Sequence, residues 1–117
     1  MSDALTLRLA RDPSSIKQAR DSLRALPELD GRADDARLLI SELVTNAIRY
    51  GEGNIRLDVL VDDDHARMVV SDDGVGDPQM VARPGQHGGW GLRLVDSLAD
   101  RWGVLGGSTQ VWAELAL

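Results

Sequence analysis

Hydrophobic and polar residues follow two different periods in the first part of the chain. Leucines alternate with polar residues over positions 5–9, which is the pattern of a half-buried strand. The next residues, Asp12-Pro13, are typical of a helix start, because aspartate caps free N–H groups and proline has no N–H to satisfy. Apolar residues then recur at helical spacing until Pro27, where we expect this first helix to end.

A second, longer helix is predicted from about Asp30-Gly31 to Gly51. Its apolar residues recur at intervals of three and four, and these positions share one face: Ala36, Leu39, Ile40, Leu43, Val44 and Ala47. Gly51 suits the left-handed conformation with which many helices end. The pattern therefore predicts an amphipathic helix whose apolar face packs on the core.

A hairpin and a long loop are predicted next. Residues 55–61 alternate between apolar and polar, residues 62–65 form an acidic turn, and residues 68–70 return as a partner strand. Residues 74–89 are rich in glycine and show no usable period, so we expect a loop. Loops of this length are usually functional or mobile.

The rest of the chain predicts one helix and two short strands. The helix covers about 90–99, and the strands cover 102–105 and 110–117. The element order is β, α, α, β, β, α, β, β, with no repeat or linker, so residues 1–117 are expected to form a single domain. We predict an α+β fold, a two-layer sandwich with a mixed, mostly antiparallel sheet and helices on one face.

Composition narrows the possible functions. The chain has 117 residues, of which 43% are hydrophobic, and a net charge of −6. This charge argues against nucleic acid and anionic membranes as partners, because both are negatively charged. There is no cysteine, which excludes disulfides and thiolate metal sites. No apolar run approaches the ~20 residues that cross a bilayer, and the N-terminal residues do not resemble a secretory signal, so we expect a cytoplasmic protein.

Glu42 and Asn46 are the first candidate functional residues. They are four positions apart on the long helix, so they project from the same side, at the edge of its apolar face. A carboxylate there is able to deprotonate a hydroxyl or water, and an amide oxygen is a ligand for Mg²⁺. The alternative is that the pair is an ordinary polar part of the helix surface.

A second candidate site directly follows the strand that ends at Val70. Asp72 offers a carboxylate that accepts a hydrogen bond from an exocyclic amine, and Gly74 and Gly76 allow the backbone to approach a flat ligand closely. The alternative is turn chemistry alone, because Asp-Gly near a proline is common in turns.

A third candidate is the glycine-rich turn that leads into the last helix and contains Gly89, Gly91 and Leu92. Free N–H groups at a helix N-terminus bind phosphate without a lysine, and Lys17 is the only lysine in the chain. The alternative is a flexible loop before a helix.

Together these signals occur in the order E-x-x-x-N, D-x-G-x-G and G-x-G-L, and each supplies a different part of a Mg·ATP site. In this order the sequence resembles the GHKL (Bergerat-fold) ATPases. SELVTNAIRYG (41–51) is similar to their N box, VVSDDGVGDP (69–78) to their G1 box, and GGWGLRLVDSLADRWGV (88–104) to their G2 box. Thr109 matches the threonine that these proteins carry near the adenine.

The resemblance implies a role for each candidate residue. Asn46 would hold Mg²⁺, Glu42 would act as the base toward a hydroxyl, and Asp72 would bind the adenine amine with help from Thr109. The remaining positions would pack against the base or present backbone N–H groups to the phosphates: Gly74, Gly76, Gly89, Gly91 and Leu92.

A domain this short resembles the bacterial anti-sigma-factor serine/threonine kinases within the superfamily. That resemblance implies transfer of phosphate from ATP to a serine or threonine of an anti-anti-sigma (STAS) protein, sequestration of a sigma factor, and a homodimer. Two alternatives stay open at this point. One is a regulator that binds ATP and a partner without transferring phosphate, and the other is a detached catalytic domain of the histidine-kinase type.

Overall fold

A computed structural model describes residues 2–74, 90–105 and 110–117. The predicted order of elements is confirmed, with these bounds: β1 Ser2–Leu9, α1 Ser14–Ser22, α2 Ala33–Tyr50, β2 Ile55–Val61, β3 His65–Asp72, α4 Trp90–Leu98, β4 Arg101–Val104 and β5 Val111–Ala116. Two 3₁₀ segments, Leu23–Ala25 and Pro27–Arg32, lie between the first two helices.

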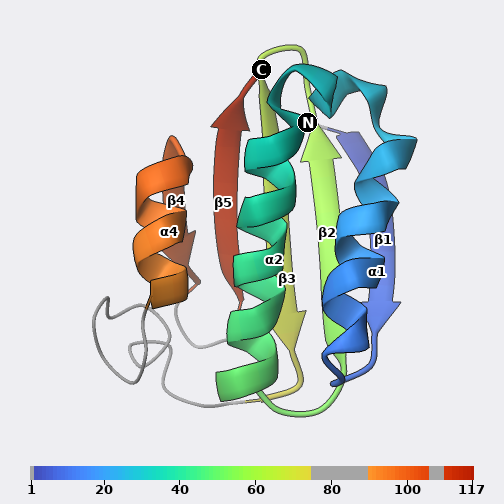
Figure 1. The fold of residues 1–117 in the computed structure, drawn as a ribbon, viewed down its shortest axis with the longest axis vertical. Helices are drawn as coiled ribbons and strands as arrows, with labels where there is room; N and C mark the ends of the chain where they lie inside the picture. Colours follow the sequence, from blue (N-terminus) through green and yellow to red (C-terminus); the bar gives the residue numbers. More distant parts are fainter. Residues whose placement is uncertain (1, 75–89, 106–109) are drawn as a thin grey trace.

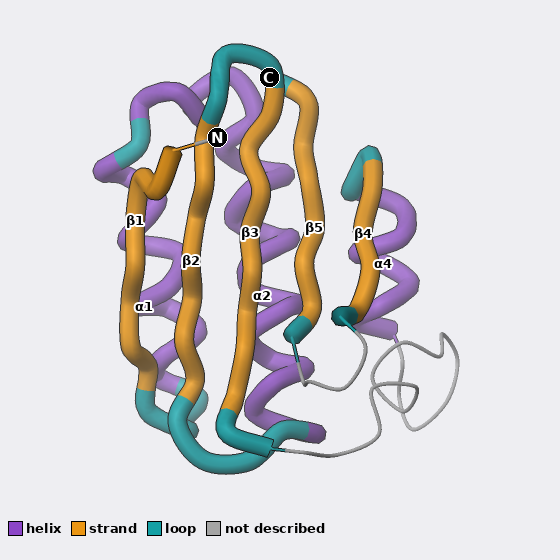
Figure 2. Tube along the Cα trace, turned by 180° about the vertical axis from the view of Figure 1, so that it is seen from behind, coloured by secondary structure: helices purple, strands orange, loops and turns teal. Residues whose placement is uncertain are grey.

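The strands form one sheet in the order β1-β2-β3-β5-β4, and neighbouring strands are antiparallel at all four described pairings. The described helices cover one face of this sheet (Figure 1), and the view from behind shows no described helix on the opposite face (Figure 2). This confirms the α+β sandwich, although the mixed character that we expected is not seen among the described strands. No helix in the described part is long and apolar enough to cross a membrane.

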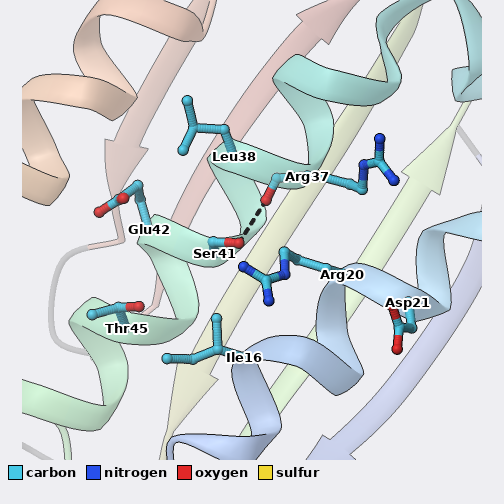
Figure 3. Close-up of a pocket in the computed structure, with 8 residues that line it drawn as sticks. All are labelled: Ile16, Arg20, Asp21, Arg37, Leu38, Ser41, Glu42 and Thr45. Carbon is cyan, nitrogen blue, oxygen red and sulfur yellow. Dashed lines mark hydrogen bonds between the residues drawn. The ribbon is translucent and has the colours of Figure 1, made fainter.

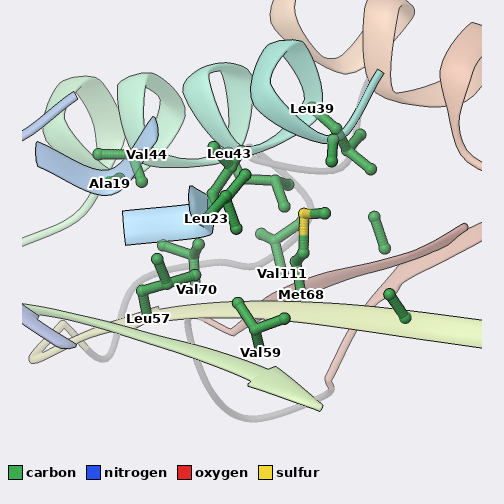
Figure 4. Packing of buried hydrophobic residues seen from close by; sticks show 14 of the residues in the cluster. Ala19, Leu23, Leu39, Leu43, Val44, Leu57, Val59, Met68, Val70 and Val111 are labelled. Carbon is green, nitrogen blue, oxygen red and sulfur yellow. The ribbon is translucent and has the colours of Figure 1, made fainter. Parts of the chain in front are cut away.

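The core lies between the sheet and the apolar face of α2. All six positions predicted for that face are at most 8% exposed. Leu39 and Leu43 point from α2 toward Val59 and Met68 of the sheet (Figure 4). Because side chains alternate along a strand, Arg67 and Trp112 lie on the opposite, open face, where the guanidinium carbon of Arg67 is 4.8 Å from the indole centroid. The periodicity therefore identified the buried side of α2 and of β2.

Both of the first two helices are shorter than the sequence suggested. The side chain of Asp12 accepts a hydrogen bond from the Ser14 N–H at 3.0 Å, as expected for a helix start. The helix ends at Ser22 rather than near Pro27, and α2 begins at Ala33 rather than at Asp30-Gly31. Tighter 3₁₀ turns fill the interval, since proline and glycine both disfavour an α-helix there.

Candidate functional site

Three elements converge at one end of the molecule. Figure 1 shows the C-terminal end of α2, the end of β3 and the first turn of α4 together at the lower end of the view. The helices α2 and α4 pack against each other in opposite directions, so the beginning of α4 lies beside the later turns of α2. All three predicted motifs therefore contribute to the same region.

A narrow cleft of about 10 Å³ opens in this region. Its walls come from α2, β3 and β5: Leu43, Asn46, Ala47, Gly51, Val70, Asp72 and Val111. Most of these side chains are apolar, and two polar ones, Asn46 and Asp72, face the same cleft. Apolar walls with a few polar groups are typical of ligand sites, but a cleft of this volume holds about one water molecule and would have to open to admit an organic ring.

Asp72 is held at the end of β3 by backbone groups. Its Oδ1 accepts hydrogen bonds from the N–H of Gly74 at 2.7 Å and from that of Glu52 at 3.2 Å. The adjacent Asp73 N–H donates to the Glu52 carbonyl at 2.9 Å. A carboxylate accepts up to about four hydrogen bonds, so Asp72 combines a fixed position with the capacity to accept one from a ligand amine.

Glu42 and Asn46 lie one turn apart on α2, and Asn46 faces the cleft beside β3 and β5. The Asn46 side chain is buried, at 7% exposed, and Glu42 is half-buried one turn earlier. Figure 3 shows the Glu42 carboxylate directed toward the neighbouring helix. Burial raises the pKa of Glu42 above its ordinary value, which makes its carboxylate a better proton acceptor.

An open groove of about 560 Å³ runs over α1 and the outer surface of α2 and reaches Glu42 (Figure 3). Arg20 lines it on α1, and Arg37 and the exposed Leu38 line it on α2. Glu42 therefore lies in the wall of the groove, one turn of α2 before Asn46. A large molecule in the groove has access to this carboxylate.

The beginning of α4 brings backbone N–H groups to the same end of the fold. Gly91 and Leu92 are in its first turn, where N–H groups have no partner within the helix. The helix is tied to β4 by Trp102, whose Nε1–H donates to Asp96 at 2.8 Å. A helix N-terminus is suited to a phosphate group, because its free N–H groups and its dipole both favour an anion.

A family model described as the histidine kinase-like ATPase domain matches residues 9–115. This match spans nearly the whole chain and includes every element that lines the cleft. The chain belongs to this family. No curated protein matches the sequence. As a GHKL-type ATPase domain, the protein is expected to bind ATP.

The structure of this ATPase domain brings together part of the predicted site. Asn46 and Asp72 line one cleft, Glu42 lies one turn from Asn46, and Gly74 donates to Asp72. Of the other predicted positions, Gly91 and Leu92 are placed by their backbone in α4. Three lie outside the described residues: Gly76, Gly89 and Thr109.

Gly51 has a different role from the one predicted. It does not adopt the left-handed conformation, because its φ is −87° and its ψ is −171°, which is extended backbone. The left-handed residue is Gly53, with a φ of +66°. Glycine is required at 51 because a Cβ would lie 2.2 Å from Asp72 Oδ2 and 2.7 Å from the Ala47 carbonyl oxygen. Sequence reasoning missed this contact, since it joins residues that are far apart along the chain.

Replacing Gly51 by alanine is expected to displace Asp72 and to weaken ATP binding. Overpacking of this kind costs about 1–3 kcal/mol of stability. Gly31→Ala is the matched control, because a Cβ there has no neighbour within 4 Å, and its stability should change by less than about 1 kcal/mol. Urea unfolding and ATP titration of both variants measure the difference. Equal ATP affinity in the two variants would contradict the role of Gly51.

Glu42→Gln is expected to raise the free energy of unfolding at neutral pH. The raised pKa shows that folding disfavours the Glu42 carboxylate. The protonated Glu42 side chain therefore stabilises the fold most at pH values below the unfolded-state pKa. This stabilisation is lost as the pH rises through the folded-state pKa. The advantage of the glutamine variant should shrink as the pH falls to about 4. Urea unfolding across this range tests it, and a variant less stable than wild type at neutral pH would refute it.

Proposed function

We propose that this ATPase domain is a protein serine/threonine kinase of the anti-sigma-factor type. It would transfer the γ-phosphate of ATP to a serine or threonine of an anti-anti-sigma (STAS) protein and would also sequester a sigma factor. The observation that carries the proposal is the position of Glu42. This carboxylate with a raised pKa stands one turn from the nucleotide cleft, at the end of a groove open to a macromolecule.

In the proposed reaction the acceptor hydroxyl oxygen attacks the γ-phosphorus while the bond to the β–γ bridging oxygen breaks. The hydroxyl proton passes to the Glu42 carboxylate, and ADP leaves. Asp72 would hold the adenine amine, and the N–H groups at the start of α4, near Gly91 and Leu92, would bind phosphate oxygens. Phosphoryl transfer depends mainly on positioning and charge stabilisation, so it needs few catalytic side chains.

Mg²⁺ fits this donor set. The Asn46 side chain is buried in the cleft and carries an amide oxygen. Mg²⁺ needs only one or two protein oxygens when phosphates and water complete its shell. Asn46 would hold the ion, which would neutralise phosphate charge during transfer.

The groove offers a surface for the acceptor protein. Arg20 and Arg37 place guanidinium groups along it, and Leu38 adds an apolar contact that is 42% exposed. Asp21 and Glu42 also line the groove, and Arg37 pairs with Asp34 at 3.0 Å. The complementary acceptor segment would therefore carry a carboxylate beside Arg20 and an apolar residue against Leu38. A homodimer is part of the same proposal, and sedimentation of the purified protein tests it.

The proposal is tested by incubating the protein with Mg·ATP carrying a labelled γ-phosphate and each STAS-type protein encoded in the same genome. Label on a serine or threonine of one candidate, identified by mass spectrometry, is the expected result. The same reactions without Mg²⁺ are the control and should show no transfer. Tight ATP binding without transfer to any candidate would overturn the kinase and would support a regulator that uses ATP as a ligand.

A further inference from the structure

We infer that Arg11 is a positioning residue for adenine recognition, because it fixes the loop 51–54 that holds Asp72. The inference rests on the proposed role of Asp72 as the ligand of the adenine amine. Arg11 is in the turn after β1, outside all three motifs of the nucleotide site. It would therefore influence the nucleotide through the protein backbone rather than by touching it.

Arg11 binds the end of α2 and the following loop at once. Its guanidinium donates hydrogen bonds to the carbonyl oxygens of Ile48, of Ala47 at 3.1 Å and of Gly53 at 3.4 Å. The Ala47 carbonyl also accepts the hydrogen bond of the Gly51 N–H at 2.9 Å. Arg11 therefore adds a cation at the negative dipole end of the helix, where a positive charge is favourable. The planar fork of arginine allows one side chain to bind several oxygens.

The same loop is bonded on its other side to the end of β3. The N–H of Glu52 donates to the Asp72 carboxylate, and the N–H of Asn54 donates to Asp73 Oδ2 at 2.8 Å. The N–H of Asp73 in turn donates to the Glu52 carbonyl oxygen. The loop thus links Arg11, through the Gly53 carbonyl, to both carboxylates. A shift of the loop would move a hydrogen-bond donor of Asp72.

Glycines allow the close packing of this connection. A Cβ on Gly53 would lie 2.4 Å from Asp73 Oδ2, and one on Gly51 would lie 2.2 Å from Asp72 Oδ2. The loop backbone is therefore pressed against both side chains. Because there is no spare space, the position of the loop determines the position of the Asp72 carboxylate.

The turn that carries Arg11 is itself fixed. The hydroxyl of Ser15, which is 2% exposed, donates to the Ala10 carbonyl at 2.7 Å, and Asp12 accepts from the Ser14 N–H. Local side-chain-to-backbone hydrogen bonds of this kind favour one conformation of the turn. Arg11 therefore holds the loop at a fixed place relative to this turn.

The test compares binding of ATP and ITP by wild type, Arg11→Ala and Arg11→Lys. ITP carries an oxygen in place of the adenine amine, so it is rejected by a carboxylate held at the correct place. We expect Arg11→Ala to lose roughly tenfold in ATP affinity, about one hydrogen bond, with ITP affinity unchanged. Arg11→Lys keeps the charge without the fork and should lie between the two proteins. Arg24→Ala, an exposed arginine of the first 3₁₀ segment, is the control and should bind as wild type does.

The outcomes separate a positioning role from a merely structural one. An arginine that only stabilises the fold would change ATP and ITP affinity equally, so an unchanged ATP/ITP ratio in folded Arg11→Ala would overturn the inference. If Arg11→Ala does not fold, the ratio in Arg11→Lys decides in the same way. A wild-type protein that binds both nucleotides equally would overturn the Asp72 assignment and the inference together. A wild-type preference for ATP that Arg11 variants retain would overturn the inference alone.

Discussion

With Glu42 replaced by glutamine, phosphoryl transfer to the acceptor protein is expected to fall by roughly 10²–10⁴-fold, the usual contribution of a general base. Glutamine keeps the size of the side chain but does not accept the hydroxyl proton. ATP affinity should be retained, because Glu42 lines the groove rather than the apolar cleft. Initial rates of labelled phosphate transfer, together with ATP titration, measure both quantities.

The control for this variant is Glu28→Gln, a change at an exposed carboxylate in the second 3₁₀ segment. It removes the same charge at a distance from the groove and should leave the rate unaltered. Transfer by Glu42→Gln at the wild-type rate would show that another group takes the proton. An equal loss in both variants would show an effect of net charge rather than of general-base catalysis.

Asp72→Asn is expected to weaken ATP binding by roughly 10–100-fold, because hydrogen bonds to charged groups contribute about 1.5–3 kcal/mol. The amide oxygen of asparagine still accepts from the backbone N–H groups of Glu52 and Gly74, so the loop should keep its conformation. The amide NH₂ would then meet the adenine amine, and two donors would face each other. Calorimetric titration with Mg·ATP measures the loss.

Asp63→Asn is the matched control, since Asp63 is exposed in the turn between β2 and β3 at the other end of the sheet. It should bind ATP with wild-type affinity. If Asp72→Asn also binds normally, the adenine does not lie against Asp72, and the assignment of the cleft is wrong. A thermal melt of each variant separates loss of the ligand contact from loss of the fold.

Much of the fold was predictable because secondary structure is governed by local periodicity. The apolar face of α2 and the alternation of β2 follow directly from side-chain direction within one element. The 3₁₀ segments before Ala33 were missed because the apolar spacing on either side of Pro27 is compatible with helix. The pattern specifies which side of an element is buried more reliably than where the element ends.

The sequence predicted which residues supply the chemical groups of the candidate site, but not the contacts that hold those residues in place. Asn46 and Asp72 were identified from motifs, and the structure places them in one cleft. The contacts that fix Asp72 join the turn after β1, the end of α2 and the end of β3, so no local pattern contains them. Gly51 illustrates the difference. Its sequence position indicated a helix end, whereas the reason that no larger residue fits there is the Asp72 carboxylate at the end of a distant strand.

The central claim is that ATP binds between the later turns of α2, the end of β3 and the start of α4. The most direct test is to titrate Mg·ATP into the ¹⁵N-labelled protein and follow the amide chemical shifts. We predict the largest changes at Asn46, Gly51, Asp72 and Gly74 and in the first turn of α4, with little change at Trp112 on the open sheet face. Large changes at Trp112 and its neighbours with an unperturbed cleft, or no saturable change anywhere, would contradict the account.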